Sequence, residues 1–120
     1  MKKKVKTVIN EEKMKNIRYS TECENEELRK DAIQEKEKGD TYYERAVDKK
    51  LGGELKLSVS YFKLAQSRYV NAEMKYAQIL ASRYQTKEDE KNHKECRTKY
   101  LSCCDKIRRI NKLIEGKILY

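Results

Sequence analysis

Apolar residues recur at alternating steps of three and four along three stretches of the chain, which is the spacing of one helix face. The middle stretch is the most regular and alternates large with small residues: Ser58, Phe62, Ala65, Tyr69, Ala72, Tyr76 and Ile79. The last stretch carries a second unbroken stripe: His93, Cys96, Tyr100, Cys103, Ile107, Ile110 and Ile114. The first stripe is weaker: Leu28, Ala32, Glu35, Gly39, Tyr42 and Ala46. The pattern predicts helices over about residues 22–50, 54–84 and 87–115.

Capping and turn residues separate these stretches. Ser20 or Thr21 can cap the first helix, and the acidic residues that follow suit the positive end of its dipole. The Leu-Gly-Gly sequence at residues 51–53 is expected to end it, since glycine adopts the left-handed conformation common at helix ends. Thr86, followed three residues later by Asp89, resembles a capping box at the start of the third helix.

The amino-acid composition agrees with the three predicted helices and indicates a small bundle. The chain has 120 residues, of which 38% are hydrophobic and 41% are charged, with four glycines and no proline. Such a chain can form the thin core of a helix bundle and not a deep enzyme interior. Three long helices with short connections pack antiparallel. We therefore predict an all-α fold: an antiparallel three-helix bundle over residues 21–120, preceded by a basic, flexible arm over residues 1–20.

The net charge of +9 is unevenly distributed. Residues 1–20 carry seven Lys or Arg against two acids, and this arm offers a basic candidate site: Lys2, Lys3, Lys4 and Lys6. A basic excess attracts phosphate groups or an acidic partner, although a solvated Lys/Glu helix surface has the same composition. No stretch approaches the roughly 18 apolar residues of a transmembrane segment, and the basic start lacks the apolar part of a secretory signal. We therefore expect a cytoplasmic protein.

The four cysteines and the single histidine are the candidates for chemistry. Cys96 and Cys103 fall on the apolar stripe of the last helix, where they serve as small core residues. Cys104 lies beside that stripe, and Cys23 lies outside the bundle. His93 is one turn from Cys96, but Cys103 is too far along the helix to complete a tetrahedral metal site, and no CxxC occurs. We expect reduced thiols, no metal, no cofactor and no enzymatic activity.

Three segments carry a family pattern: KGDTYYERAVD, LSVSYFKLAQSRYVNAEMKYA and CRTKYLSCCDKI. The first helix ends on Ala46-Val47-Asp48, and the second carries a small residue, an aromatic and a small residue at 58, 62 and 65. In the third, residues 100–107 read YLSCCDKI, where the family has Tyr-Leu-x-Arg-Ala-Glu-x-Leu. Over residues 38–114 the chain resembles an MIT (microtubule-interacting and trafficking) domain, a TPR-like three-helix module. The first two helices also look like a TPR hairpin, although the first is about two turns too long and one copy is visible.

The resemblance implies peptide binding. MIT domains bind the C-terminal tails of ESCRT-III proteins, often as a helix laid in the groove between the second and third helices. The matching positions are Leu101, which would be the apolar contact, and Asp105, which would pair with a basic ligand residue. Cys103 replaces the Arg of the family and Cys104 its Ala. These departures favour a more acidic tail, as does the basic run that follows: Lys106, Arg108 and Arg109.

Two other function classes stay open. The basic arm and the basic helix faces, interleaved with tyrosines, suit non-specific nucleic-acid binding, although no helix-turn-helix, RRM or zinc motif is present. Alternatively, the chain is a self-assembling structural or accessory subunit, in which helices pair between chains as a homo-oligomer. Leu101 also fits a plain core position, because a three-helix bundle needs a wide apolar face.

Overall fold

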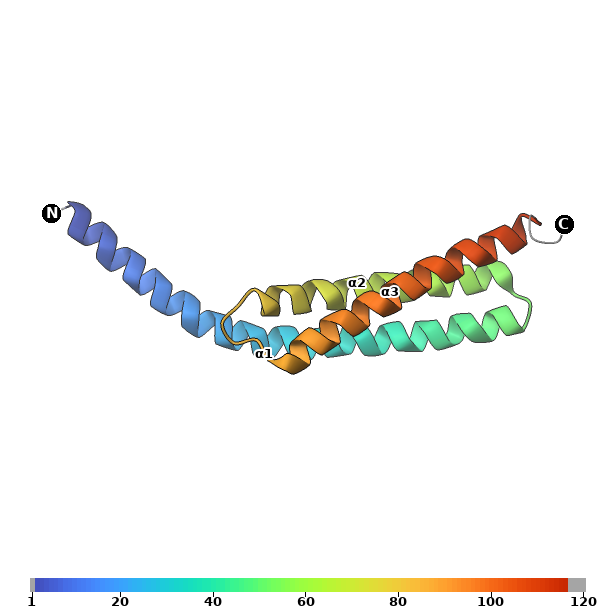
Figure 1. Cartoon of the computed structure of the whole chain (residues 1–120), viewed down its shortest axis with the longest axis horizontal. Coiled ribbons are helices and arrows are strands. Elements are labelled where there is room, and N and C mark those ends of the chain that lie inside the picture. Colours follow the sequence, from blue (N-terminus) through green and yellow to red (C-terminus); the bar gives the residue numbers. More distant parts are fainter. Residues whose placement is uncertain (1, 117–120) are drawn as a thin grey trace.

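A computed structural model describes the backbone of residues 2–116 and the side chains of residues 22–116. It contains three α-helices: α1 (Lys2–Leu51), α2 (Leu55–Leu80) and α3 (Lys87–Ile114). Neighbouring helices run in opposite directions, with α3 packed along the hairpin of α1 and α2 (Figure 1). The described residues include no β-strand, and no helix among them is long and apolar enough to cross a membrane. The predicted all-α three-helix bundle is confirmed.

The first helix begins at Lys2, twenty residues before the start that the acidic stretch predicts, so no helix is capped at residue 20 or 21. The reason is that nothing interrupts it: the chain has no proline and no glycine before Gly39, and Lys and Glu are good helix formers. The N-terminal part of α1 extends beyond the bundle, and the molecule is 77 Å long (Figure 1). The side chains of residues 1–21 lie outside the described part, so the basic arm stays a prediction as a site.

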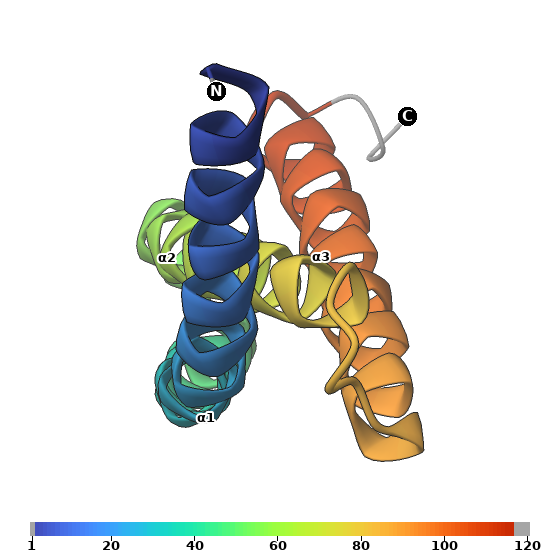
Figure 2. The ribbon, with the colours of Figure 1, turned by 90° about the vertical axis from the view of Figure 1, so that its left-hand side faces the viewer.

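α2 is the central helix of the bundle. Both α1 and α3 pack along it, whereas the backbones of α1 and α3 stay farther apart from each other. All seven predicted stripe residues of α2 are buried: Ser58, Phe62, Ala65, Tyr69, Ala72, Tyr76 and Ile79. Their alternation of large and small side chains lets a neighbouring helix approach closely at each alanine. α3 crosses the α1–α2 hairpin obliquely, as the view along the molecule makes clear (Figure 2).

A polar cluster ties α1 to the loop between α2 and α3. Arg29 Nε donates to Asp89 Oδ1 at 2.9 Å, and its Nη2 donates to Asp89 Oδ2 at 2.7 Å and to the Tyr84 carbonyl at 2.6 Å. Asp89 also completes the predicted capping box, because it accepts from the backbone N–H of Thr86 at 2.8 Å and its own N–H donates to the Thr86 hydroxyl. The start of α3 is thereby fixed against α1.

The Arg29–Asp89 pair should make stability depend on acid pH. The hydrogen bond from Arg29 lowers the pKa of Asp89 below its ordinary value, and bonds from Thr86 lower it further. Because the folded-state pKa lies below the unfolded one, the stabilisation is present above the unfolded pKa of about 3.9 and is lost as pH falls through the folded pKa. We expect Asp89→Asn to lower the free energy of unfolding by about 2 kcal/mol at neutral pH.

The same substitution should flatten the loss of stability between about pH 4 and pH 2, measured by urea unfolding across that range. Asp31→Asn is the matched control, because the Asp31 carboxylate is 57% exposed and 4.0 Å from Lys75. An acid dependence that is the same in wild type and Asp89→Asn would contradict the role of this pair.

Gly39 marks the close approach of α1 to α2. A Cβ at this position would lie 2.7 Å from Cε1 of Tyr69, whose ring is 1% exposed. Alanine is favoured over glycine in a helix by about 1 kcal/mol, but overpacking a core costs about 1–3 kcal/mol. We expect Gly39→Ala to destabilise the protein by about 1 kcal/mol in urea unfolding. Gly52→Ala is the control, since its nearest contact would be an ordinary 3.5 Å, and a stabilised Gly39→Ala would contradict the close packing.

Candidate functional site

The two residues that the resemblance predicts as ligand contacts, Leu101 and Asp105, lie together on α3 with the candidate Arg108 of the basic run that follows them. Leu101, Asp105 and Arg108, with Cys104 beside them, line one shallow pocket of about 260 Å³. The Leu101 side chain is 51% exposed, so it is not a core residue. An apolar side chain is therefore available at the surface at the position where the family pattern has its apolar contact.

The charges around this pocket are basic on balance. The Asp105 carboxylate pairs with Arg108 at 2.7 Å and with Arg109 at 3.0 Å, and the hydrogen bond from Arg108 lowers the pKa of Asp105. Both arginines stay largely exposed, at 68% and 70%. Asp105 is thus already neutralised by its own helix, and the guanidinium groups remain accessible to a ligand.

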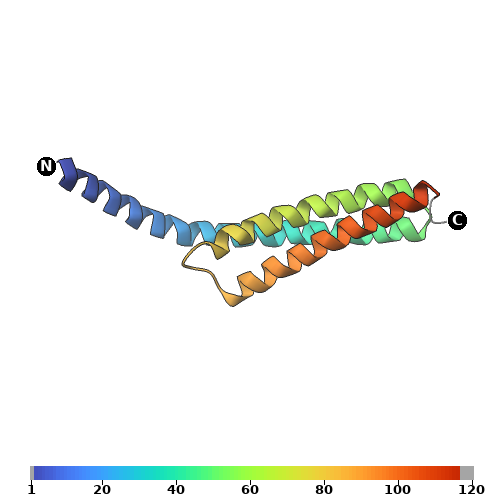
Figure 3. The ribbon, with the colours of Figure 1, turned by 45° about the horizontal axis from the view of Figure 1, so that its top comes forward.

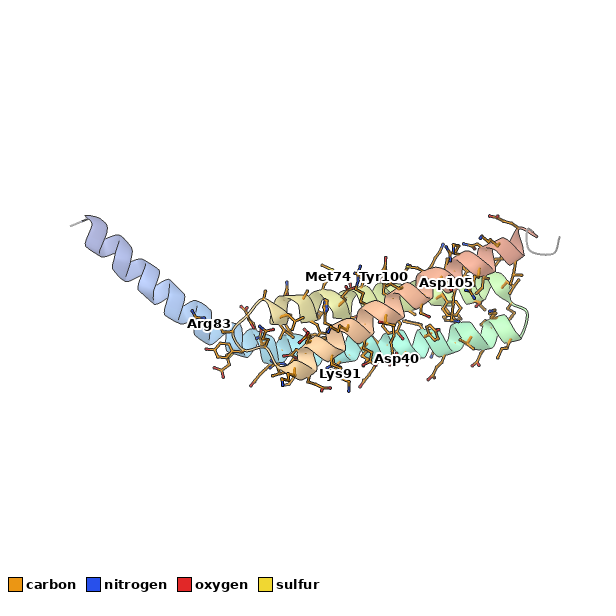
Figure 4. The ribbon with its side chains drawn as sticks, in the orientation of Figure 1. Asp40, Met74, Arg83, Lys91, Tyr100 and Asp105 are labelled. Atoms are coloured by element: carbon orange, nitrogen blue, oxygen red, sulfur yellow. The ribbon has the colours of Figure 1, made fainter. Side chains whose placement is uncertain are left out.

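Side chains of α2 border the same region of α3. Gln66 Nε2 donates to Cys104 Sγ at 3.0 Å, and Glu73 accepts from Arg97 Nη1 at 3.0 Å. Arg97 precedes Leu101 by one turn and is 60% exposed. Leu101 lies on the outer side of α3 between Arg97 and Cys104, with an exposed arginine before it and two after it. Figure 4 labels Tyr100 and Asp105 on this part of α3, and it labels Asp40 on α1.

A second hollow lies between α1 and α3 and was not predicted from the sequence. Its volume is about 520 Å³, and its lining comes from all three helices: Asp40, Tyr43, Glu44, Tyr69, Thr98, Lys99 and Ser102. The polar groups in it are largely paired with one another: Lys99 Nζ lies 2.7 Å from Asp40 Oδ1, and the Tyr43 and Ser102 hydroxyls are 3.1 Å apart. The residue types gave no signal for it, because it arises from the separation of α1 and α3.

Cys96 and Cys103 occupy core positions, as the helical spacing predicts. Cys96 and Cys103 are fully buried, and burial raises the pKa of the Cys96 thiol to about 11 and that of the Cys103 thiol to about 12. Cys104 is half-buried and Cys23 is exposed, and all four are free thiols. His93 Nε2 lies 3.9 Å from a Glu73 carboxylate oxygen. Within the described side chains, no three His, Cys, Asp or Glu residues gather in a way that could hold a metal ion.

Comparison with protein-family models, with curated proteins and with solved structures gave no match to this chain. The MIT resemblance consequently rests on the quoted residues alone and stays a prediction. The candidate surface rests on the exposure of Leu101 and on the arginines around it.

Thiol reactivity should separate the cysteines by burial. Because only thiolates react and buried thiols are shielded, iodoacetamide at neutral pH should label Cys23 first, Cys104 more slowly, and leave Cys96 and Cys103 unmodified in the folded protein. Mass spectrometry of digests would report the labelled positions, and the urea-unfolded protein is the control in which all four should react. Rapid labelling of Cys103 in the folded protein would contradict its core position.

Proposed function

We propose that this protein is a non-enzymatic interaction module that binds an acidic, helical peptide tail along α3, on the exposed side that carries Leu101. The observation that carries the proposal is the half-exposed Leu101 between exposed arginines. An amphipathic helix in such a site is held by one or two apolar anchors, while flanking charges set its orientation. Leu101 supplies the apolar contact on this chain.

The arginines favour carboxylates in the ligand. A guanidinium group can hold a carboxylate through two parallel hydrogen bonds, which fixes geometry as well as charge. Arg97 and Arg108 lie on the two sides of Leu101 along the helix, about 16 Å apart at 1.5 Å per residue. A ligand helix with acidic residues spaced on either side of an apolar residue would match this pattern.

The resemblance to MIT domains supports the same class of ligand. It points to C-terminal tails of ESCRT-III proteins, and the basic surface favours the more acidic of them. With such a ligand the protein would act in the cytoplasm, in membrane remodelling.

Fluorescence anisotropy with labelled ESCRT-III tail peptides tests the proposal at physiological salt. We expect saturable binding that Leu101→Asp weakens at least tenfold, roughly the loss typical of a central apolar contact. The reason is that the new carboxylate removes the anchor and repels an acidic ligand. Helical content and melting temperature should not change, because the Leu101 side chain is half exposed.

Leu64→Asp is the matched control, because Leu64 is 44% exposed on α2 and lies outside the candidate pocket. It should bind a single labelled peptide as the wild type does. Binding that is equally strong in wild type and Leu101→Asp, with both proteins folded, would refute the assignment. Absence of binding by any acidic tail would refute the ligand class.

A further inference from the structure

The side of α2 that faces away from the core carries an uncharged stripe. From Leu57 to Ala81, eight exposed residues follow one another at alternating steps of three and four, and none of them is charged, although 41% of the chain is. We call this set the α2 stripe. This spacing is that of the seam along which two helices pair in a coiled coil. Figure 3 shows α2 along the upper edge of the bundle, and in Figure 4 Met74 lies on the side of α2 away from Asp40.

The α2 stripe contains both apolar and neutral polar residues. Its apolar members are Leu57, Leu64, Met74 and Ala81, and the Met74 side chain is 62% exposed. Its polar members are Ser60, Ser67, Asn71 and Gln78. A partner for this surface must match apolar positions with apolar ones and hydrogen-bonding positions with hydrogen-bonding ones, because a buried polar group without a partner is costly.

A second copy of α2 meets this requirement when it lies antiparallel with the two-fold axis level with Tyr69. In that register Leu64 of each copy faces Met74 of the other, and Leu57 faces Ala81. The polar positions coincide as well: Ser67 faces Asn71 and Ser60 faces Gln78. All four residue pairs are centred on residue 69. A single register therefore matches every position of the α2 stripe, as a two-fold interface requires.

The residues beside the stripe decide between antiparallel and parallel pairing, since a parallel pair would also place like residues together. In a parallel pair Lys63 of one copy would face Arg68 of the other, which sets like charges against each other. In the antiparallel pair Lys63 faces Ala77 and Val70 meets its own copy on one flank, while on the other flank Arg68 meets its own copy. The parallel pair thus contains two contacts between like charges and the antiparallel pair contains one, between arginines that each pair with Glu35 of their own chain, which favours the antiparallel arrangement.

The other flank of the stripe is neutralised within each chain. Arg68 pairs with Glu35 of α1 at 3.1 Å, and Lys75 lies 4.0 Å from Asp31. A second copy on the stripe therefore meets paired charges on this side rather than a row of free cations. The uncharged centre, the antiparallel match and the paired flank all point to the same occupant.

We propose that the protein forms an antiparallel homodimer through the α2 stripe. The Leu101 surface of α3 is separate from this stripe, so each copy keeps its own candidate peptide site. The dimer would then be bivalent and would gain avidity for a partner that displays several tails. This inference is independent of the proposed peptide ligand, because it concerns a different face and a different measurement.

A charge exchange measured by analytical ultracentrifugation of the full chain tests both the surface and the register. We expect the wild type to dimerise, and Leu64→Glu or Met74→Lys alone to raise the dimer dissociation constant at least about a hundredfold, because each dimer would bury two unpaired charges. The double variant Leu64→Glu/Met74→Lys should regain dimerisation, since in the antiparallel register each introduced carboxylate faces an introduced ammonium group. In a parallel dimer it would face its own copy, and no recovery would occur.

Ile33→Glu is the control, with the same charge change at a similarly exposed position on α1, and it should dimerise as the wild type does. Circular dichroism should confirm that every variant keeps its helical content. A wild type that remains monomeric at about 1 mM would overturn the dimer. A dimer unaffected by either single variant would overturn the surface, and a double variant as weak as the single ones would overturn the antiparallel register.

Discussion

The contact of Tyr69 with α1 and α3 is the interaction on which the rest of the structure depends. Its ring lies against Gly39, where α1 has no side chain, and its hydroxyl donates to Asp40 of α1 at 2.5 Å. Asp40 in turn accepts from Lys99 of α3 at 2.7 Å. Burial raises the pKa of Tyr69, so the phenol remains a neutral donor at every physiological pH. One residue of the central helix thereby positions both of its neighbours.

This arrangement leaves two surfaces of different chemistry free. Since α1 and α3 both pack on the core side of α2, the opposite side of α2 remains uncovered and carries neutral residues. α3 leans across the hairpin, so its outer side remains exposed with Leu101 among arginines. An uncharged, heptad-spaced surface suits a helix of like pattern, whereas an apolar residue among cations suits an acidic ligand. The central position of α2 therefore accounts for both.

The regular parts of this fold could be predicted because they depend on local spacing. The core stripe of α2, the Thr86 capping box and the burial of Cys96 and Cys103 all follow from residues within a few turns of each other. The hollow between α1 and α3 could not be predicted, because it depends on the angle between helices that share no sequence signal.

The edges of the apolar faces were harder to predict for the same reason. Leu64 and Ala77 are apolar and sit beside the α2 core stripe, yet both are exposed. How far a face is covered depends on where the neighbouring helices lie, and α1 and α3 leave this part of α2 open. The role of Leu101 was ambiguous between core and surface until the position of α3 decided it.

The pairing of Asp105 with arginines of its own helix bears on how a ligand would bind. Ion pairs on an exposed helix surface at spacings of three and four stabilise a protein by only about 0–1 kcal/mol. Arg108 can therefore leave Asp105 for a ligand carboxylate at little cost, while Asp105 keeps Arg109 at 3.0 Å. Asp105 keeps the acidic charge that the family pattern has at this position. It would then hold the arginines in position near Leu101 and would not contact a basic ligand group. Under the proposed function, that exchange of partners would let the site accept an acidic tail although it contains Asp105.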